Sequence, residues 1–347
     1  MNTTTLTTGL PVETSTERLS DTAVDADISE ENYEEFSFYT TVVATPIICA
    51  LGLTANSLGL GVLLRASRQD KLAIYVYLCS LTILDSTFLF TGLLRSSPNL
   101  IRVFDKYLAN KIEQYSNLGF IYIDMVLTYT ATYIIVIMAI ERLMALVRPF
   151  SIKDSTLTKH PKKIVFLTLI LNAIFLCPFP INFEVASYEN DENRTEYYLR
   201  YKLYAVEWMA DYEFVHTFVH NYIPGSILLV VNVAIPIAFA RILKRRSALK
   251  TTSSLSGHQT KITSAVMGIT VLYFLFSIPD GFIKTRAYFD RDYSFSGKYR
   301  LNFWLFVDIS NLFTYLNAAN DFVIYILVSD HYRTIFKEMY CGCLVRI

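Results

Sequence analysis

The sequence predicts an all-α membrane protein: a seven-transmembrane helix bundle followed by a short amphipathic C-terminal helix. Of its 347 residues, 53% are hydrophobic and only 18% are charged, whereas soluble domains carry roughly a quarter charged residues. Seven apolar stretches are long enough to cross a bilayer, which takes about 20 helical residues. They lie near residues 38–65, 72–95, 114–146, 163–185, 213–244, 259–288 and 301–328.

This pattern divides the chain into three parts: an acidic N-terminal tail (1–37), a transmembrane domain (38–328), and an amphipathic helix with a short tail (329–347). The apolar residues of the last part recur at helical spacing, so we expect this helix to lie on the inner leaflet. Cys341 and Cys343 follow it. We expect both to be S-acylated, with two free thiols as the alternative.

The charges of the loops predict the orientation. Residues 241–261, between the fifth and sixth spans, hold six bases and no acid, whereas the segment before the first span closes on four glutamates. Because bases collect on the cytoplasmic side, we expect an outer N-terminus and a cytoplasmic C-terminus in the plasma membrane. The N-x-S/T sequons at Asn2 and Asn193 fall on the expected outer side, as glycosylation requires. The formal net charge is zero, so the bulk charge does not favour a nucleic-acid partner, and none is expected.

Ionisable and polar groups recur deep in the expected spans. Asp85 lies in the second span, Asp124 in the third and Asp321 in the seventh, with Asn56 and Asn317 at comparable depth. A charge in the hydrocarbon region costs several kcal/mol unless it is paired or hydrated. Such groups can merely tie helices together by hydrogen bonds. Three carboxylates in one bundle favour a site, because their available partners are each other, water or a cation.

Six motifs, in order along the chain, resemble those of rhodopsin-like G-protein-coupled receptors. The third span ends in A-I-E-R-L-M-A-L-V-R-P, where Glu141 and Arg142 match the acid and the arginine of that family. F-S-I-P, ending at Pro279, resembles the helix-six C-W-x-P, and N-A-A-N-D-F-V-I-Y, ending at Tyr325, resembles N-x-x-x-N/D-P-x-x-Y. A-N-S-L, S-L-T-I-L-D and the helix-five Pro224 supply the others. The resemblance covers about residues 38–340.

The chain also departs from that pattern. Ser277 replaces the helix-six tryptophan and Phe322 the helix-seven proline, and Asn117 occupies the position of the helix-three cysteine. No cysteine falls in an expected outer loop, so the family's outer disulfide cannot form. The missing tryptophan and the N-D-F-V-I-Y sequence resemble invertebrate peptide receptors of the FMRFamide type.

The resemblance implies a mechanism of activation. Arg142 is expected to pair with Glu141 at rest and to face a heterotrimeric G protein once helix six moves outward, with Pro279 and Tyr325 in the activation motifs. Because ligand and G protein prefer the same state, each raises the affinity for the other.

The resemblance also implies an internal sodium pocket. Asn56, Asp85, Asn317 and Asp321 resemble its residues. Two neighbouring carboxylates either share a proton or hold a cation. No other cofactor is expected.

The expected ligand site lies in the outer half of the third span. Asp124 precedes Arg142 by eighteen residues, about 27 Å along a helix. This resembles the position at which receptors for amines and some peptides pair an aspartate with a ligand cation. Tyr315 resembles a tyrosine that hydrogen-bonds this aspartate, and Asp280 adds a second negative group. The alternative is an Asp124 satisfied by neighbouring tyrosine and threonine hydroxyls.

We therefore expect a receptor for a cationic or amidated neuropeptide, with a biogenic amine receptor as the alternative. A membrane transporter is a distant alternative, because the sequence lacks the internal repeats typical of that class. An enzyme is not expected: His216 and His220 are spaced i, i+4 but lack the glutamate of the zinc motif H-E-x-x-H. The last span has no lysine to carry a retinal group.

Overall fold

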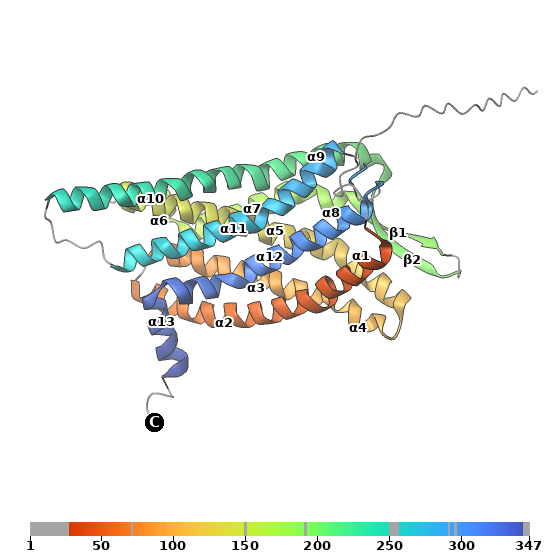
Figure 1. Ribbon diagram of the computed structural model, residues 1–347, viewed down its shortest axis with the longest axis horizontal. Coiled ribbons are helices and arrows are strands. Elements are labelled where there is room, and N and C mark those ends of the chain that lie inside the picture. Colours follow the sequence, from red (N-terminus) through yellow and green to blue (C-terminus); the bar gives the residue numbers. More distant parts are fainter. Residues whose placement is uncertain are drawn as a thin grey trace, which may run out of the picture.

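The computed structural model describes residues 28–70, 72–148, 151–190, 193–249, 257–290, 292–294 and 297–342. Asn2 and Cys343, two of the expected modification sites, lie outside these ranges. The chain forms an elongated bundle of roughly parallel helices (Figure 1). In chain order the helices and strands are α1 (Glu30–Ser37), η1 (Phe38–Ala44), α2 (Thr45–Asp70), α3 (Ala73–Ser96), α4 (Pro98–Arg102), α5 (Lys106–Val147), η2 (Ile152–Asp154), α6 (Thr156–Lys159), α7 (Pro161–Leu176), α8 (Pro178–Asn182), β1 (Phe183–Glu189), β2 (Thr195–Tyr201), η3 (Leu203–Ala205), α9 (Val206–Thr217), η4 (Phe218–Tyr222), α10 (Ile223–Leu249), α11 (Gly257–Phe289), α12 (Arg300–Val328), α13 (Asp330–Phe336) and η5 (Lys337–Cys341).

The expected seven-transmembrane bundle is confirmed. Six helical stretches of the described chain are long and apolar enough to cross a membrane, and α12 with the segment beyond a 101° bend supplies the seventh. The bend turns α13 and η5 away from the bundle (Figure 1), as the expected amphipathic helix requires.

Two helices begin earlier than the hydropathy predicts. The first starts at Glu30 and continues through η1 into α2, so the residues expected to close the acidic tail are helical. Helix α5 starts at Lys106 because Asp105 caps it, accepting hydrogen bonds from the backbone amides of Tyr107 and Leu108 at 3.0 Å each. Both extensions are polar, which is why hydropathy does not reveal them.

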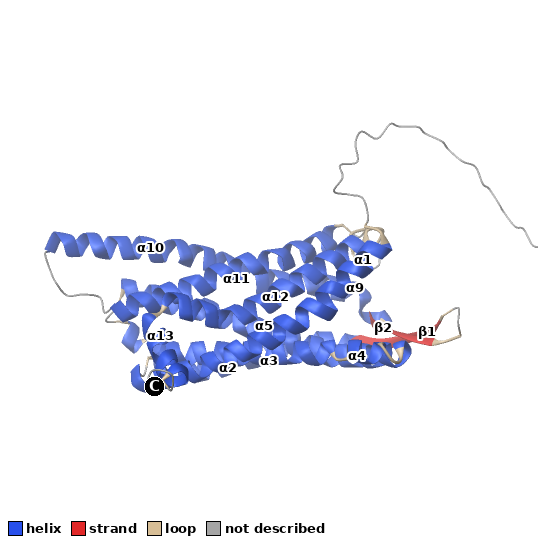
Figure 2. Ribbon diagram, turned by 60° about the horizontal axis from the view of Figure 1, so that its bottom comes forward, coloured by secondary structure: helices blue, strands red, loops and turns tan. Residues whose placement is uncertain are grey.

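The expected fourth span, 163–185, corresponds to the apolar helical stretch Pro161–Asn182 and extends three residues past it. The helix breaks at Cys177, before Pro178 opens the short helix α8, and the antiparallel hairpin of β1 and β2 follows from Phe183. The hairpin lies at the end of the bundle opposite α13 (Figure 2). The sequence analysis did not predict these strands.

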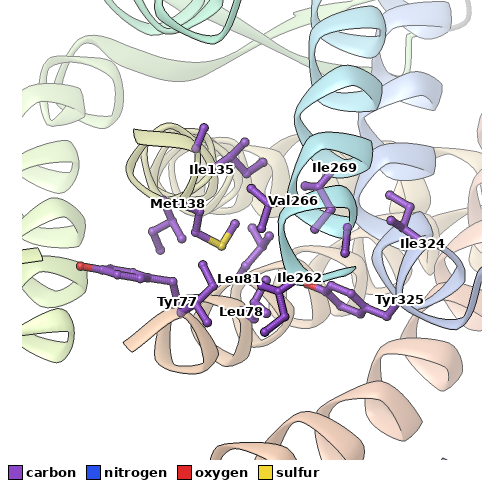
Figure 3. Close-up of a cluster of buried hydrophobic side chains, with 14 of the residues drawn as sticks. Tyr77, Leu78, Leu81, Ile135, Met138, Ile262, Val266, Ile269, Ile324 and Tyr325 are labelled. Carbon is purple, nitrogen blue, oxygen red and sulfur yellow. The ribbon is translucent and has the colours of Figure 1, made fainter. Parts of the chain in front are cut away.

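The apolar core lies in the half of the bundle nearer α13 and joins α3, α5, α11 and α12 (Figure 3). Leu81, Met138 and Val266 are at most 1% exposed there. A second apolar cluster lies beneath the hairpin; its buried members are Val126, Tyr129, Leu176, Phe179, Ala205 and Met209. Helix α5 contributes to both clusters: Val126 and Tyr129 belong to the second, and Ala131 to Leu146 supply its share of the first.

Candidate functional site

Asp124 is buried in α5, on the side of the helix's midpoint nearer the hairpin, and is paired with a base of α3. Its side chain is 7% exposed, and its Oδ2 lies 3.0 Å from Arg95 Nη1. The Thr91 hydroxyl donates to Oδ1 at 2.5 Å. Arg95 also donates from Nε to Asn117 Oδ1 at 3.2 Å. A threonine hydroxyl does bind Asp124, as the alternative expected. The sequence analysis did not predict that Arg95 also pairs with this carboxylate.

Thr91 and Arg95 are four residues apart near the end of α3, so they lie on one face of that helix. This spacing is the signal that could have identified them. Tyr315 stacks on Phe88 of the same helix, with ring centroids 4.8 Å apart. It also packs so closely on Gly92 that an added Cβ would lie 2.6 Å from its ring. The expected hydrogen bond from Tyr315 to Asp124 is absent among the bonds found for the described residues.

Asp280 belongs to a second ion pair and is not brought to Asp124. Its Oδ2 lies 2.8 Å from Lys284 Nζ, one helical turn along α11, and accepts from Asn221 Nδ2 at 2.9 Å. Lys284 also donates to the Tyr129 hydroxyl at 3.2 Å. Each carboxylate that was expected to attract a ligand cation thus already has a base of the chain beside it.

His216 and His220 are buried next to this second pair. Both are 2% exposed, their ring centroids are 4.8 Å apart, and both rings meet Tyr129 edge to face. Nε2 of His216 and both ring nitrogens of His220 have no hydrogen-bond partner. Within the described ranges, no group of three or more histidine, cysteine or acidic side chains could hold a metal ion.

Near the C-terminal end of α5, Glu141 and Arg142 form the expected pair. Nε and Nη2 of the arginine lie 2.6 and 2.7 Å from the two carboxylate oxygens, and the side chains are 4% and 7% exposed. The geometry is bidentate, which is the strongest arrangement for this pair of groups. Arg142 therefore has its carboxylate partner inside α5 itself.

The expected internal cation pocket is only partly assembled. Asp85 and Asp321 are both buried and lie next to each other, so the two carboxylates can share a proton or hold a cation. Asn56 donates to the Ala318 carbonyl at 2.9 Å, while its own Oδ1 and Oδ2 of Asp321 have no partner. Asn317, half-buried on α12, makes no bond to either carboxylate among those found. These two unpartnered oxygens are of the kind that binds a hard cation such as sodium.

Two residues of the expected activation motifs, Tyr325 and Pro279, lie on α12 and α11. Tyr325 is buried in the core with its hydroxyl unpartnered, and its ring is 5.3 Å from that of Tyr332. Pro279 lies inside α11, where it removes one helical hydrogen bond and favours a kink. Below it, the Thr270 hydroxyl donates to Asn232 Oδ1 at 2.6 Å and ties α11 to α10.

The expected modification sites that fall among the described residues, Asn193 and Cys341, lie at opposite ends of the molecule. Asn193 is exposed at the tip of the hairpin, with a positive φ of 54°. Cys341 ends η5 and carries a free thiol. The helix before it is held against α2 by the pair of Arg65 and Glu338, 3.0 Å apart.

A bundle of seven membrane helices with a buried acid–arginine pair near the end of the third is typical of a G-protein-coupled receptor. The chain belongs to the serpentine type 7TM GPCR chemoreceptor Srw family, whose model matches residues 43–343. This family consists of receptors, not enzymes.

Two relatives from Caenorhabditis elegans are similar over most of this chain. A probable G-protein-coupled receptor is 25% identical over 309 residues, which cover 85% of this chain and 68% of the relative. A protein named as an FMRFamide peptide receptor is 25% identical over 317 residues, 87% of this chain and 69% of its own length.

Proposed function

We propose that this receptor binds a cationic or amidated neuropeptide from outside the plasma membrane and activates a heterotrimeric G protein. Two ion pairs that involve α5 carry the proposal: Asp124 of α5 pairs with Arg95 of α3, and Glu141 pairs with Arg142 at the far end of α5. The rhodopsin-like motifs and the relative named as an FMRFamide peptide receptor support the same class. The basic 241–261 segment supports a cytoplasmic inner end.

The ligand cation would take the place of Arg95 at Asp124. Arg95 is 29% exposed while Asp124 is 7% exposed, so the base is the more accessible of the two. Exchanging one guanidinium or ammonium for another leaves the carboxylate paired and avoids a bare buried charge. A biogenic amine is the alternative occupant of this carboxylate. A peptide is preferred because a longer ligand also reaches the second pair, Asp280 and Lys284, on α11.

Activation would separate Arg142 from Glu141. Desolvation of a buried pair offsets most of its Coulomb attraction, so the pair restrains the arginine without locking it. A G protein that binds the freed Arg142 and a ligand that binds the same state each raise the affinity for the other.

The internal pocket is proposed to hold one sodium ion. Asn56 Oδ1 and Asp321 Oδ2, both buried and unpartnered, would bind it beside Asp85. The ion would supply the positive charge that two neighbouring carboxylates lack.

The test is a ligand screen in cells that express the full chain with a promiscuous G protein. Amidated peptides, including FMRFamide, are compared with biogenic amines at equal surface expression. We expect activation by an amidated or basic peptide. Activation by an amine and by none of the peptides would contradict the peptide proposal and support a biogenic amine receptor. The active ligand is then tested on Asp124→Asn, with Asp211→Asn as the matched control, because Asp211 is a carboxylate that pairs with the Tyr288 hydroxyl and not with a base.

A further inference from the structure

The outer hairpin is attached to the first turns of α5 through one side chain. Asn110 Oδ1 accepts a hydrogen bond from the Tyr197 backbone amide at 2.8 Å, and its Nδ2 donates to the Tyr197 carbonyl at 3.2 Å. A single amide group thus binds both backbone groups of one strand residue.

The register of the hairpin explains why these backbone groups are free to bind Asn110. Asn190 N donates to Arg194 O at 2.9 Å and Lys202 N donates to Asn182 O at 2.8 Å, which marks them as hydrogen-bonded pairs. Such pairs alternate with non-bonded pairs in an antiparallel ladder. Tyr197, opposite Ser187, therefore belongs to a non-bonded pair and turns its amide and carbonyl away from β1.

An outward-facing edge of this kind leaves donors and acceptors unsatisfied. The side-chain amide of asparagine carries the same donor and acceptor as a peptide group. Asn110 consequently pairs with β2 as one residue of a third strand would.

Neighbouring side chains of α5 hold the same part of the hairpin. Lys111 Nζ lies 5.6 Å from the centre of the Tyr197 ring, and the Tyr115 ring is 6.0 Å from it. Arg194, at the turn, lies over Tyr107 at 5.5 Å. Tyr107, Lys111 and Tyr115 are spaced four residues apart, so they form one face of the helix.

We infer that Asn110 is a positioning residue that holds the outer hairpin in one register against α5, through a two-point contact with Tyr197 that we call the Asn110–Tyr197 clamp. The four cysteines of the described chain carry free thiols, and neither strand contains a cysteine. The clamp is therefore noncovalent and reversible: the hairpin can leave and return without a redox step. This inference does not depend on the nature of the ligand.

Hydrogen exchange of the full-length receptor in lipid nanodiscs tests the clamp without a ligand. Asn110→Ala removes the acceptor for the Tyr197 amide, and we expect exchange in residues 195–201 to rise about tenfold. Asn110→Asp keeps an acceptor and should retain most of the protection, while Lys111→Ala, which spares both hydrogen bonds, is the matched control. Thermal unfolding of each variant separates a local effect from a loss of fold. Exchange in Asn110→Ala within twofold of wild type would overturn the inference.

A cross-linking experiment gives a second readout should Asn110→Ala not fold. Cysteines are placed at 110 and 197, and a protease site is placed at the hairpin tip so that only a disulfide holds the fragments together. Cysteines at 110 and 199 are the control, because residue 199 lies about 7 Å farther along the strand. We expect the 110–197 pair to cross-link at least ten times faster. Equal rates, or faster linking at 199, would contradict the register and the clamp.

Discussion

Opposite substitutions in the Asp124–Arg95 pair should move agonist potency in opposite directions. Asp124→Asn keeps the shape of the side chain and removes its charge, so a ligand cation meets no carboxylate. Truncating one partner of a buried charge pair costs about 2–5 kcal/mol. Because Arg95 is 29% exposed, solvent screens part of the interaction, and we expect a loss near the lower end, at least about tenfold in potency.

Arg95→Gln should instead raise potency, because the ligand no longer competes with a guanidinium for Asp124. A hydrogen bond to a charged group contributes about 1.5–3 kcal/mol, and partial exposure reduces it, so a gain of about three- to tenfold is expected. Asn117→Ala is the control: it removes the 3.2 Å bond to Arg95 Nε and leaves the ion pair in place.

The assay is a concentration–response curve in cells matched for surface expression, with the cationic agonist that the ligand screen identifies. Two results would refute the reasoning. One is a shift below about threefold for Asp124→Asn. The other is an Arg95→Gln variant that loses as much potency as Asp124→Asn, because Arg95 would then be a ligand contact or a support of the fold.

Three further predictions concern the inner half of the receptor. Arg142→Ala should abolish G-protein signalling while ligand binding and surface expression persist; normal signalling at equal expression would contradict the activation proposal. Sodium should raise the thermal unfolding temperature of the wild-type receptor and have no effect on Asp85→Asn, since the variant retains only Asp321 as a carboxylate in the pocket; a potassium series serves as the control, and equal sodium dependence in both proteins would exclude the site. Acyl exchange should label the wild-type tail but not a variant in which Cys341 and Cys343 are both serine; equal labelling would show that these cysteines are not acylated.

The spans of the bundle could be predicted because a bilayer requires long apolar helices, and the apolar runs of this chain are long. The same criterion failed where a helix leaves the membrane. The turns of α5 from Lys106 onward are polar and stabilised by the Asp105 cap. A hydropathy profile detects apolar runs and therefore does not reveal a polar helix start that depends on a capping residue. The hairpin was missed because its first residues continue the apolar run of α7. Its signal was present in T-E-Y-Y-L-R-Y, a sequence rich in residues that favour strands.

The candidate site shows a similar division between local and distant contacts. Glu141 and Arg142 are neighbours on one helix, so their pairing follows from the sequence. Arg95 and Asp124 are separated by 29 residues, and their contact depends on the rotation of α3 relative to α5. That rotation is set by packing across the whole bundle, and one-dimensional patterns do not contain it.

The length of helix α5 between Asn110 and Asp124 bears on the size of the ligand. Asn110, which meets the hairpin, and Asp124, which meets Arg95, are fourteen residues apart on this continuous helix. At 1.5 Å per residue this separation is about 21 Å, and an extended peptide covers that distance with about six residues. A monoamine reaches one of these two points. A hexapeptide reaches both, so the length of α5 between them gives the smallest extended ligand that touches Asn110 and the buried carboxylate together.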